Sequence, residues 1–264
     1  MAQSSLETNS LSCLVTRPKH QADNLKQLLI QQGFKVLCFP TIDIIPASKS
    51  ACLSNLDSHL AEWDIALFVS RNAVDFTFNH IKLPLPSSLQ LGVIGKGSLL
   101  ALNEHGVSTH IIPAENYNSE GLLESSVLLN VRAKRIVIFR GQEGRNLLGD
   151  TLRERGAKVE YIEVYQRIAP EYAAGHFAEL TQQHSPDVAI FTSAEGLHNA
   201  FKLLSPDEAK MLRSKAWLLI SERMRETACD LGHNADIIIA SSASDEGILQ
   251  ALKQWHQSIT QKLL

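Results

Sequence analysis

The sequence contains the same pattern twice, and this internal duplication constrains the fold more than any other feature. In the first part of the two copies, corresponding residues lie 123 positions apart, as do Arg17 and Arg140, Gly33 and Gly156, and Ser70 and Ser193. After a short insertion the separation becomes 126 positions, as for Gly95 and Ser221 and for Glu120 and Glu246. The match covers almost the whole chain, so the two copies are expected to contain the same elements in the same order.

Each copy alternates short apolar runs with longer amphipathic segments. Short continuous apolar runs are typical of parallel strands whose two faces are covered by the helices of βαβ crossovers. We therefore predict an α/β fold with parallel sheets flanked by helices. The predicted strands lie at 13–15, 35–39, 65–69, 91–94 and 108–112 in the first copy, and at 135–139, 158–162, 188–191, 217–220 and 236–240 in the second.

Two extended stretches occupy equivalent positions in the copies, and Pro46 and Pro170 end them. If these stretches pair as a two-stranded antiparallel β-ribbon, the chain passes from one lobe to the other along the first and returns along the second. One lobe is then discontinuous. The predicted domains are lobe one at 1–38 and 170–264, lobe two at 47–161, and the ribbon at 39–46 and 162–169.

Composition describes an ordinary globular protein and argues against several functions. Of the 264 residues, 44% are hydrophobic and 20% are charged, so the chain can bury a sizeable core. The net charge of −3 argues against nucleic-acid binding, and no apolar run reaches the ~20 residues of a membrane helix. The polar residues 1–12 are predicted to be a tail and not a signal peptide. We expect a cytoplasmic protein that binds neither nucleic acid nor a membrane.

The familiar signatures of metal, nucleotide and nucleophile sites are missing. The four cysteines form no C-x-x-C pair, so neither a zinc site nor a disulfide framework is predicted. Gly95-Lys-Gly97 and Arg140-Gly-Gln-Glu-Gly144 lack the spacing of phosphate-binding and dinucleotide-binding loops. No nucleophile elbow or Ser/His/Asp order is present. We expect no metal and no cofactor.

Basic and hydroxyl side chains recur in the turns that follow the predicted strands. In open α/β sheets ligands bind at this edge, where helix N-termini present free N–H groups. The candidate anion-binding residues are Arg17, Ser70, Arg71, Asn72, Gly95, Lys96, Ser119, Arg140, Gly141, Ser193, Ala194, Ser221 and Arg223.

Each of these residues also has a simpler interpretation. Ser70, Ser119, Ser193 and Ser221 are predicted to cap helices, which stabilises a helix by about 1 kcal/mol and is compatible with ligand binding. Each basic side chain, taken singly, is best explained as a surface charge in an ion pair worth roughly 0–1 kcal/mol. Their shared position after strands nevertheless indicates an anion site.

Tyr165 lies in the second extended stretch, and two roles for it remain open. A tyrosine on a segment between lobes commonly packs in the core or the ribbon. Alternatively, its hydroxyl donates a hydrogen bond in the cleft, since ligand sites concentrate between domains.

The motifs, in their order and spacing, resemble those of the uroporphyrinogen-III synthase family over essentially the whole chain after the tail. The matching segments are Leu14-Val-Thr-Arg-Pro18, Phe68-Val-Ser-Arg-Asn-Ala-Val74, Gly95 with its following helix, Asn118-Ser-Glu-Gly-Leu122, Glu163-Val-Tyr-Gln-Arg167 and Phe191-Thr-Ser-Ala-Glu-Gly-Leu197. The resemblance implies two α/β lobes joined by a two-stranded ribbon.

The resemblance also implies an activity in porphyrin, and hence heme, biosynthesis. The family's substrate is hydroxymethylbilane, a linear tetrapyrrole rich in carboxylates, which is cyclised with loss of water and inversion of the last pyrrole ring. Tyr165 matches the tyrosine that is proposed to assist departure of the hydroxyl. The chain departs from the family at Ser221-Glu-Arg-Met224, where many members carry a Gly-Pro-Thr turn; Ser221 and Arg223 are the candidates to replace the threonine.

A second class of function fits the same residues. A two-lobed cytosolic binding protein would grip an anionic metabolite in its cleft without transforming it. For either function we expect a monomer whose partner is a small molecule, hydroxymethylbilane in the case of the enzyme. The enzyme would also contact the preceding enzyme of the pathway transiently to receive its unstable substrate.

Overall fold

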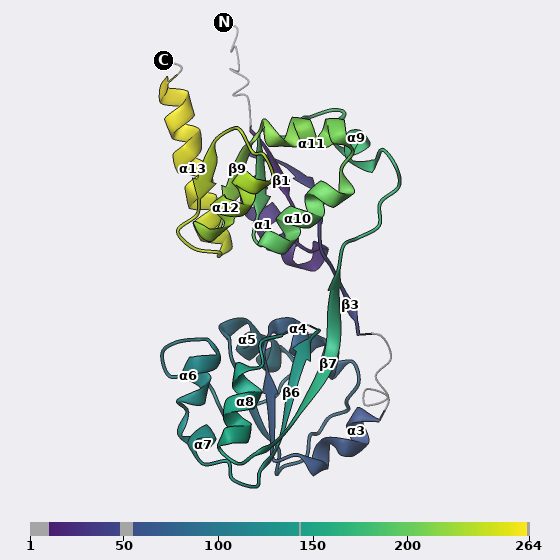
Figure 1. Cartoon of the computed structure of the whole chain (residues 1–264), viewed down its shortest axis with the longest axis vertical. Coiled ribbons are helices and arrows are strands. Elements are labelled where there is room, and N and C mark those ends of the chain that lie inside the picture. Colours follow the sequence, from purple (N-terminus) through teal and green to yellow (C-terminus); the bar gives the residue numbers. More distant parts are fainter. Residues whose placement is uncertain (1–10, 48–54, 143, 263–264) are drawn as a thin grey trace, which may run out of the picture. The chain divides into compact units, whose positions relative to one another are not determined.

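The computed structural model describes residues 11–47, 55–142 and 144–262, and it divides the chain into two compact units. Unit 1 comprises Met1–Asp43 and Ile168–Leu264, and unit 2 comprises Ile44–Arg167. Each unit has one sheet with helices on both of its faces (Figure 1). The predicted α/β class with parallel sheets flanked by helices is therefore confirmed.

Unit 1 contains a five-stranded sheet of order β10-β9-β8-β1-β2, in which all neighbouring strands are parallel. Its strands are β1 (Ser12–Val15), β2 (Lys35–Cys38), β8 (Val188–Phe191), β9 (Ala216–Leu219) and β10 (Ile237–Ile239). Its helices are α1 (Lys19–Gln31), α9 (His176–Thr181), α10 (Ala194–Leu203), α11 (Pro206–Arg213), α12 (Arg223–Asp230) and α13 (Asp245–Lys262). Helices α1 and α13 cover one face, and α9 to α12 cover the other.

Unit 2 contains a five-stranded sheet of order β3-β7-β6-β4-β5, in which β5, β4, β6 and β7 are parallel. Its strands are β3 (Asp43–Pro46), β4 (Ile65–Phe68), β5 (Gln90–Val93), β6 (Arg135–Gly141) and β7 (Lys158–Ile168). Its helices are α3 (Leu56–His59), the 3-10 turn η1 (Leu60–Glu62), α4 (Arg71–Phe78), α5 (Lys96–Glu104), α6 (Ser119–Leu123), α7 (Ser126–Leu129) and α8 (Leu147–Glu154). Helices α3 to α5 cover one face, and α6 to α8 cover the other.

Four strands of each sheet follow an equivalent order, β9-β8-β1-β2 in unit 1 and β5-β4-β6-β7 in unit 2, because the copies of the duplicated sequence exchange their first βαβ segment. In unit 1, β1 and β2 of the first copy join β8 to β10 of the second, whereas in unit 2, β6 and β7 of the second copy join β4 and β5 of the first. The joints are the parallel pairs β1 with β8 and β4 with β6. Neither sheet is therefore built from one copy alone.

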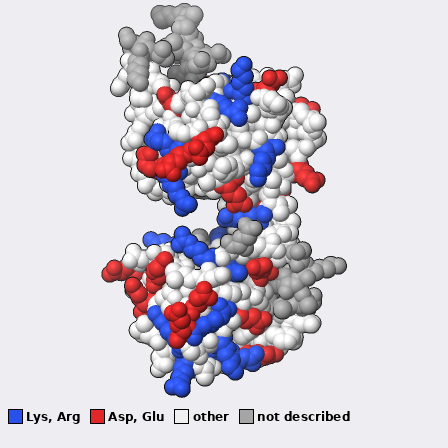
Figure 2. Space-filling model, in the orientation of Figure 1, with Lys and Arg blue, Asp and Glu red and all other residues white. Residues whose placement is uncertain are grey.

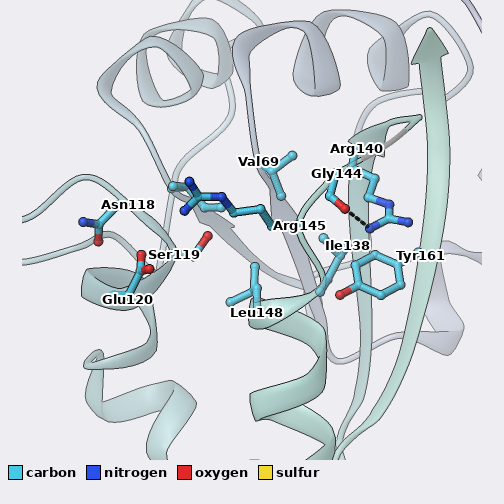
Figure 3. Close-up of a pocket in the computed structure, with 11 residues that line it drawn as sticks. Val69, Asn118, Ser119, Glu120, Ile138, Arg140, Gly144, Arg145, Leu148 and Tyr161 are labelled. Carbon is cyan, nitrogen blue, oxygen red and sulfur yellow. Dashed lines mark hydrogen bonds between the residues drawn. The ribbon is translucent and has the colours of Figure 1, made fainter. Parts of the chain in front are cut away.

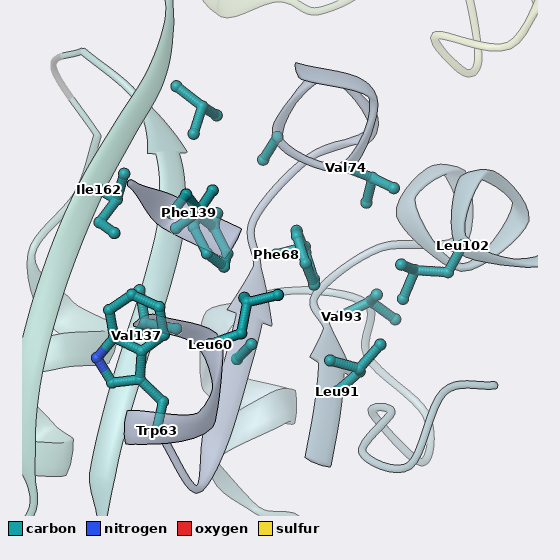
Figure 4. Close-up of a cluster of buried hydrophobic side chains, with 14 of the residues drawn as sticks. Leu60, Trp63, Phe68, Val74, Leu91, Val93, Leu102, Val137, Phe139 and Ile162 are labelled. Atoms are coloured by element: carbon teal, nitrogen blue, oxygen red, sulfur yellow. The ribbon is translucent and has the colours of Figure 1, made fainter. Parts of the chain in front are cut away.

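The core of unit 2 between its sheet and α3 to α5 is rich in aromatic rings (Figure 4). The rings of Phe68 and Phe139 stack with centroids 5.1 Å apart, and Trp63 meets Phe139 edge-on. All four residues of β4 are buried. Burial on both faces explains why these strands read as continuous apolar runs and not as alternating ones.

Two predictions about elements need correction. The predicted strand at 108–112 is absent, and only Ile111 forms an isolated bridge, with Gly92. Ser108, Thr109 and His110 are polar and Ile112 is 44% exposed, so none of these four residues adds a buried apolar side chain to the sheet. The tail predicted at 1–12 includes Ser12, which instead begins β1 and is buried. Residues 1–10 of that tail lie outside the described residues.

The second extended stretch is not separate from the strand before it, because β7 runs without interruption over both. Next to it, β3 lies at the edge of the sheet, where the Ala47 N–H donates to the Val164 carbonyl oxygen (3.1 Å). None of the helices in the described ranges has an apolar stretch of the length that a membrane crossing needs.

Substituting Phe139→Ala should lower the free energy of unfolding by about 3–5 kcal/mol, because the fully buried ring would leave a cavity against Phe68 and Trp63. Urea unfolding followed by circular dichroism measures the change. Leu129→Ala is the control, since this side chain is 57% exposed and should lose no more than about 0.5 kcal/mol. Equal losses in the two variants would show that the Phe139 ring does not contribute to this core.

Candidate active site

The helices that follow the strands begin at the carboxyl edge of each sheet, and two of the predicted serine caps are confirmed. Ser70 caps α4 by accepting a hydrogen bond from the Ala73 N–H (3.0 Å). Ser193 caps α10 by accepting from the Gly196 N–H, also at 3.0 Å. In both cases the backbone of the serine is extended, as an N-cap requires.

The other two predicted caps are wrong. Helix α6 is capped by Asn118, whose side-chain oxygen accepts from the Gly121 N–H (2.7 Å), so Ser119 is the first helical residue. The N-cap residue of α12 is Glu222, which makes no side-chain cap, and Ser221 precedes it. Asparagine is as good a cap as serine, so the sequence could not tell which of the neighbours Asn118 and Ser119 would take the position.

Tyr165 pairs with one of the predicted serines at this edge. Its side chain is buried, and its hydroxyl lies 3.1 Å from the Ser70 hydroxyl. Its ring stacks on Phe76, with centroids 5.8 Å apart. Either hydroxyl can be the donor in this pair. Where Ser70, which accepts from the Ala73 amide, donates to the tyrosine oxygen, the Tyr165 O–H is available to another acceptor.

A β-bulge places the Tyr165 ring on the side of the sheet where Ser70 lies. Arg140 pairs with Glu163, but the next residue, Gly141, pairs with Tyr165, so Val164 is an extra residue in β7. Tyr165 consequently packs on the same face as Val164, in the core under α4. Such bulges re-aim side chains and are often found next to active sites.

Gly141 leaves the space that the Tyr165 ring occupies. A methyl group at Gly141 would lie 2.6 Å from ring atoms Cε2 and Cζ and 3.0 Å from the hydroxyl oxygen. The Gln142 N–H also donates to the Tyr165 carbonyl oxygen (3.0 Å), which fixes the strand end. Glycine is thus required for the close approach of β6 to this ring.

A pocket of about 310 Å³ opens at the same edge on the other face of the sheet, between α6 and α8 (Figure 3). It contains the predicted residues Ser119 and Arg140. Sequence reasoning missed Arg145 and Tyr161, which also line it. Arg145 lies beyond the turn that follows β6, so inspection of the first turn residues alone could not find it.

The Arg140 guanidinium is held on several sides. It lies over the Tyr161 ring, 4.0 Å from its centroid, and Nη1 donates to Asn146 Oδ1 (2.9 Å). Nη2 forms an ion pair with Glu163 at 3.3 Å. Arg140 is therefore a fixed cation and not a mobile surface side chain.

The other predicted residues of unit 2 differ in how free they are. Arg71 pairs with Glu104 and Asp75, and the hydrogen bond from Arg71 lowers the pKa of the Glu104 carboxyl. The side chain of Asn72 is buried. Gly95 has open space beside it, since a methyl group there would meet no atom within 4 Å. The Lys96 ammonium lies over the Tyr117 ring, 5.2 Å from its centroid. Lys and Arg side chains gather along the upper edge of unit 2 in Figure 2.

In unit 1, the predicted residue Arg17 is bound by other groups of the chain. Its guanidinium pairs with Asp245 and donates to the Ala243 carbonyl oxygen (2.8 Å), which ties the turn after β1 to the start of α13. Ala194 and Arg223 instead line a pocket of about 600 Å³ beside α10 and α12, together with His198 and Asp230.

These features define a protein of two α/β units with parallel strands, a partly buried tyrosine–serine hydroxyl pair and an arginine-lined pocket at the carboxyl edge of one sheet. The chain matches the family model described as "Uroporphyrinogen-III synthase HemD" over residues 23–250. The uroporphyrinogen-III synthase of Escherichia coli K12 is 33% identical over 251 residues, covering 92% of this chain and 100% of the relative. The putative synthase of Methanothermobacter thermautotrophicus is 29% identical and covers 72% of this chain and 76% of that relative.

Two solved structures share the fold. The synthetase from Helicobacter pylori 26695 superposes with a TM-score of 0.60 at 13% identity, covering 93% of this chain and 99% of that one. A mutant synthase from Thermus thermophilus gives a TM-score of 0.58 at 17% identity, covering 94% and 100%. The chain belongs to the uroporphyrinogen-III synthase family, a family of lyases whose substrate is hydroxymethylbilane.

Gly141→Ala should reduce turnover of hydroxymethylbilane by about 10-fold or more, because the new methyl group displaces the Tyr165 ring from Ser70. Product formation measured at saturating substrate checks this. Gly97→Ala is the matched control, since its nearest neighbour, Arg71 Cβ, would lie at an ordinary 3.8 Å. Full activity in Gly141→Ala would show that the position of the ring is unimportant.

Proposed function

We propose that this chain cyclises hydroxymethylbilane to uroporphyrinogen III, with loss of water and inversion of the last pyrrole ring. The observation that supports this most directly is the Tyr165 hydroxyl, buried at the carboxyl edge and hydrogen-bonded to Ser70. Membership of the family makes a binding protein that leaves its ligand unchanged the less favoured alternative.

Tyr165 acts as the hydrogen-bond or proton donor to the departing hydroxyl. The pyrrole nitrogen lone pair expels the hydroxyl as the C–O bond breaks, and the proton from Tyr165 completes the water molecule. The last ring first attacks the resulting cation through the carbon that already carries its bridge, which gives a spiro intermediate. That bridge bond then breaks, and the free α-carbon of the same ring forms a new C–C bond to the released bridge carbon. This α-carbon loses its proton, which restores the tyrosine, and the ring is left inverted. Ser70 donates to the phenolic oxygen and stabilises the charge that develops there.

The protein chiefly orients a reactive substrate, because uncatalysed closure gives the uninverted isomer. Substrate carboxylates bind at the turns after the strands, through side chains and helix N–H groups. The residues that we assign to substrate binding are Ser70, Asn72, Gly95, Lys96, Ser119, Arg140, Gly141, Ser193, Ala194, Ser221 and Arg223. Arg17 and Arg71, which like Arg140 also pair with carboxylates of the chain itself, complete the set that we assign to substrate binding.

The chain works as a cytoplasmic monomer that needs no cofactor and receives its unstable substrate from the preceding enzyme. Free thiols at Cys13, Cys38 and Cys229 suit a reducing compartment. The thiol of Cys13 is buried, and burial raises its pKa to about 12, which makes it unreactive.

Incubation of the protein with freshly prepared hydroxymethylbilane, followed by oxidation and separation of the porphyrin isomers, tests the activity. We expect the inverted isomer in excess over the isomer that forms without protein. Formation of the uninverted isomer alone, with binding of the bilane detected by calorimetry, would favour the binding protein.

Tyr165→Phe should slow turnover by about 10–100-fold, because it removes the proposed donor and keeps the ring. The unfolding free energy should change little. Tyr172→Phe is the control: its hydroxyl also makes one hydrogen bond, to the Pro40 carbonyl oxygen (2.8 Å), but lies outside the proposed site. If both variants turn over at the wild-type rate, Tyr165 serves packing only.

A further inference from the structure

The pocket between α6 and α8 combines two cations with an apolar floor. Arg140 and Arg145 line it, while Ile138 and Leu148 contribute buried aliphatic surface. Glu120 is the one carboxylate among the described lining residues, so the arginines give the pocket a net positive charge. A ligand that combines an apolar body with an acidic arm fits this chemistry.

Arg145 is the freer of the two cations. Its side chain extends from the loop before α8 toward α6 (Figure 3). Within the described ranges, no hydrogen bond or ion pair engages its guanidinium. Its five N–H donors therefore remain available to a carboxylate, which guanidinium groups bind in a bidentate manner.

Arg140 is fixed by contacts that do not use all of its donors. The Nε atom is buried and finds no acceptor among the described residues. Buried donors are normally paired, so folding stability alone does not explain this arginine. Its stacking on Tyr161 and its bonds to Asn146 and Glu163 hold the guanidinium at the pocket wall.

Tyr161 has two separate contacts, one through its hydroxyl and one through its ring. The hydroxyl donates to the Asn146 carbonyl oxygen (3.0 Å) and accepts from the Gly149 N–H (3.1 Å), so it caps α8 from outside the helix. The Gly149 amide is consequently not available to an anion. The ring supports Arg140, which leaves the guanidinium groups as the anion-binding part of the pocket.

We propose that this pocket binds one acetate or propionate arm of the tetrapyrrole, with its carboxylate on Arg145 and Arg140, and that Tyr161 is a positioning residue for Arg140. The inference rests on the proposed function, which supplies a ligand whose pyrrole rings carry such arms. The pyrrole ring lies on the apolar floor and the arm reaches the guanidinium groups.

Steady-state kinetics of Arg145→Gln and Arg140→Gln test the binding role. Each variant should raise KM by about 10-fold or more, as expected for loss of a charged hydrogen bond, with a smaller change in kcat. Arg153→Gln is the matched control, because Arg153 lies over the same Tyr161 ring (5.2 Å) but bonds Asp150 and Val159 and does not line the pocket. Its KM should remain that of the wild type.

Two substitutions separate the ring of Tyr161 from its hydroxyl. Tyr161→Phe keeps the surface under Arg140 and should leave KM within about 3-fold of the wild type, whereas Tyr161→Leu should raise KM as Arg140→Gln does. Urea unfolding of both variants measures how much stability is lost with the hydroxyl that caps α8. A purely structural role would lower stability in both and leave KM unchanged in both, which would overturn the positioning role.

The outcomes distinguish this subsite from the proposed activity. Wild-type protein that forms no uroporphyrinogen III overturns the activity and the subsite together. Active wild-type protein with unchanged KM in both arginine variants overturns the subsite alone. Calorimetric titration with uroporphyrinogen III, kept free of oxygen, should show that the arginine variants bind it more weakly than the wild type, by a factor similar to the rise in KM.

Discussion

Strand pairing between the two copies of the duplicated sequence holds both sheets together. The parallel contact of β1 with β8 joins Cys13 to Val188, and that of β4 with β6 joins Ile65 to Ile136. Each joint lies inside its sheet, so without it the sheet separates into pieces of two or three strands. Unit 1 therefore cannot complete its core until strands from both ends of the chain are present, which makes its contacts strongly non-local.

The class and the order of elements could be predicted because they depend on local patterns. Apolar runs, helix periodicity and the repeated spacing of Arg17 with Arg140 and of Ser70 with Ser193 are all visible in the sequence. What could not be predicted depends on the neighbours of a segment. The residues around Ile111 resemble a strand in the sequence, but only one bridge forms there, and β7 continues without a break through the stretch that the sequence presents as a separate element.

The charged part of the site was less predictable than the fold. A basic residue after a strand has the same appearance in the sequence whether it is free or paired, because its partner is distant in sequence. Asp245 engages Arg17 from the far end of the chain, and Glu104 engages Arg71 from the end of the following helix, α5. Conversely, Arg145 was not among the predicted binding residues, although its guanidinium has no partner among the described residues and lines the pocket.

The bulge at Val164 decides which groups can act together at the edge of unit 2. On a regular strand Tyr161 and Tyr165, four residues apart, would point to the same face, because side chains alternate with a period of two. The extra residue sends Tyr165 to Ser70 on the α4 face and leaves Tyr161 under Arg140 on the α8 face. The Tyr165 hydroxyl and the arginine-lined pocket thus flank the end of β6, where Gly141 lies. In the proposed reaction, an elongated ligand crosses this strand end. Its acidic arm binds the arginines on one face of the sheet, and its reacting carbon lies near Tyr165 on the other face. Binding and chemistry thus take place on two faces of one sheet.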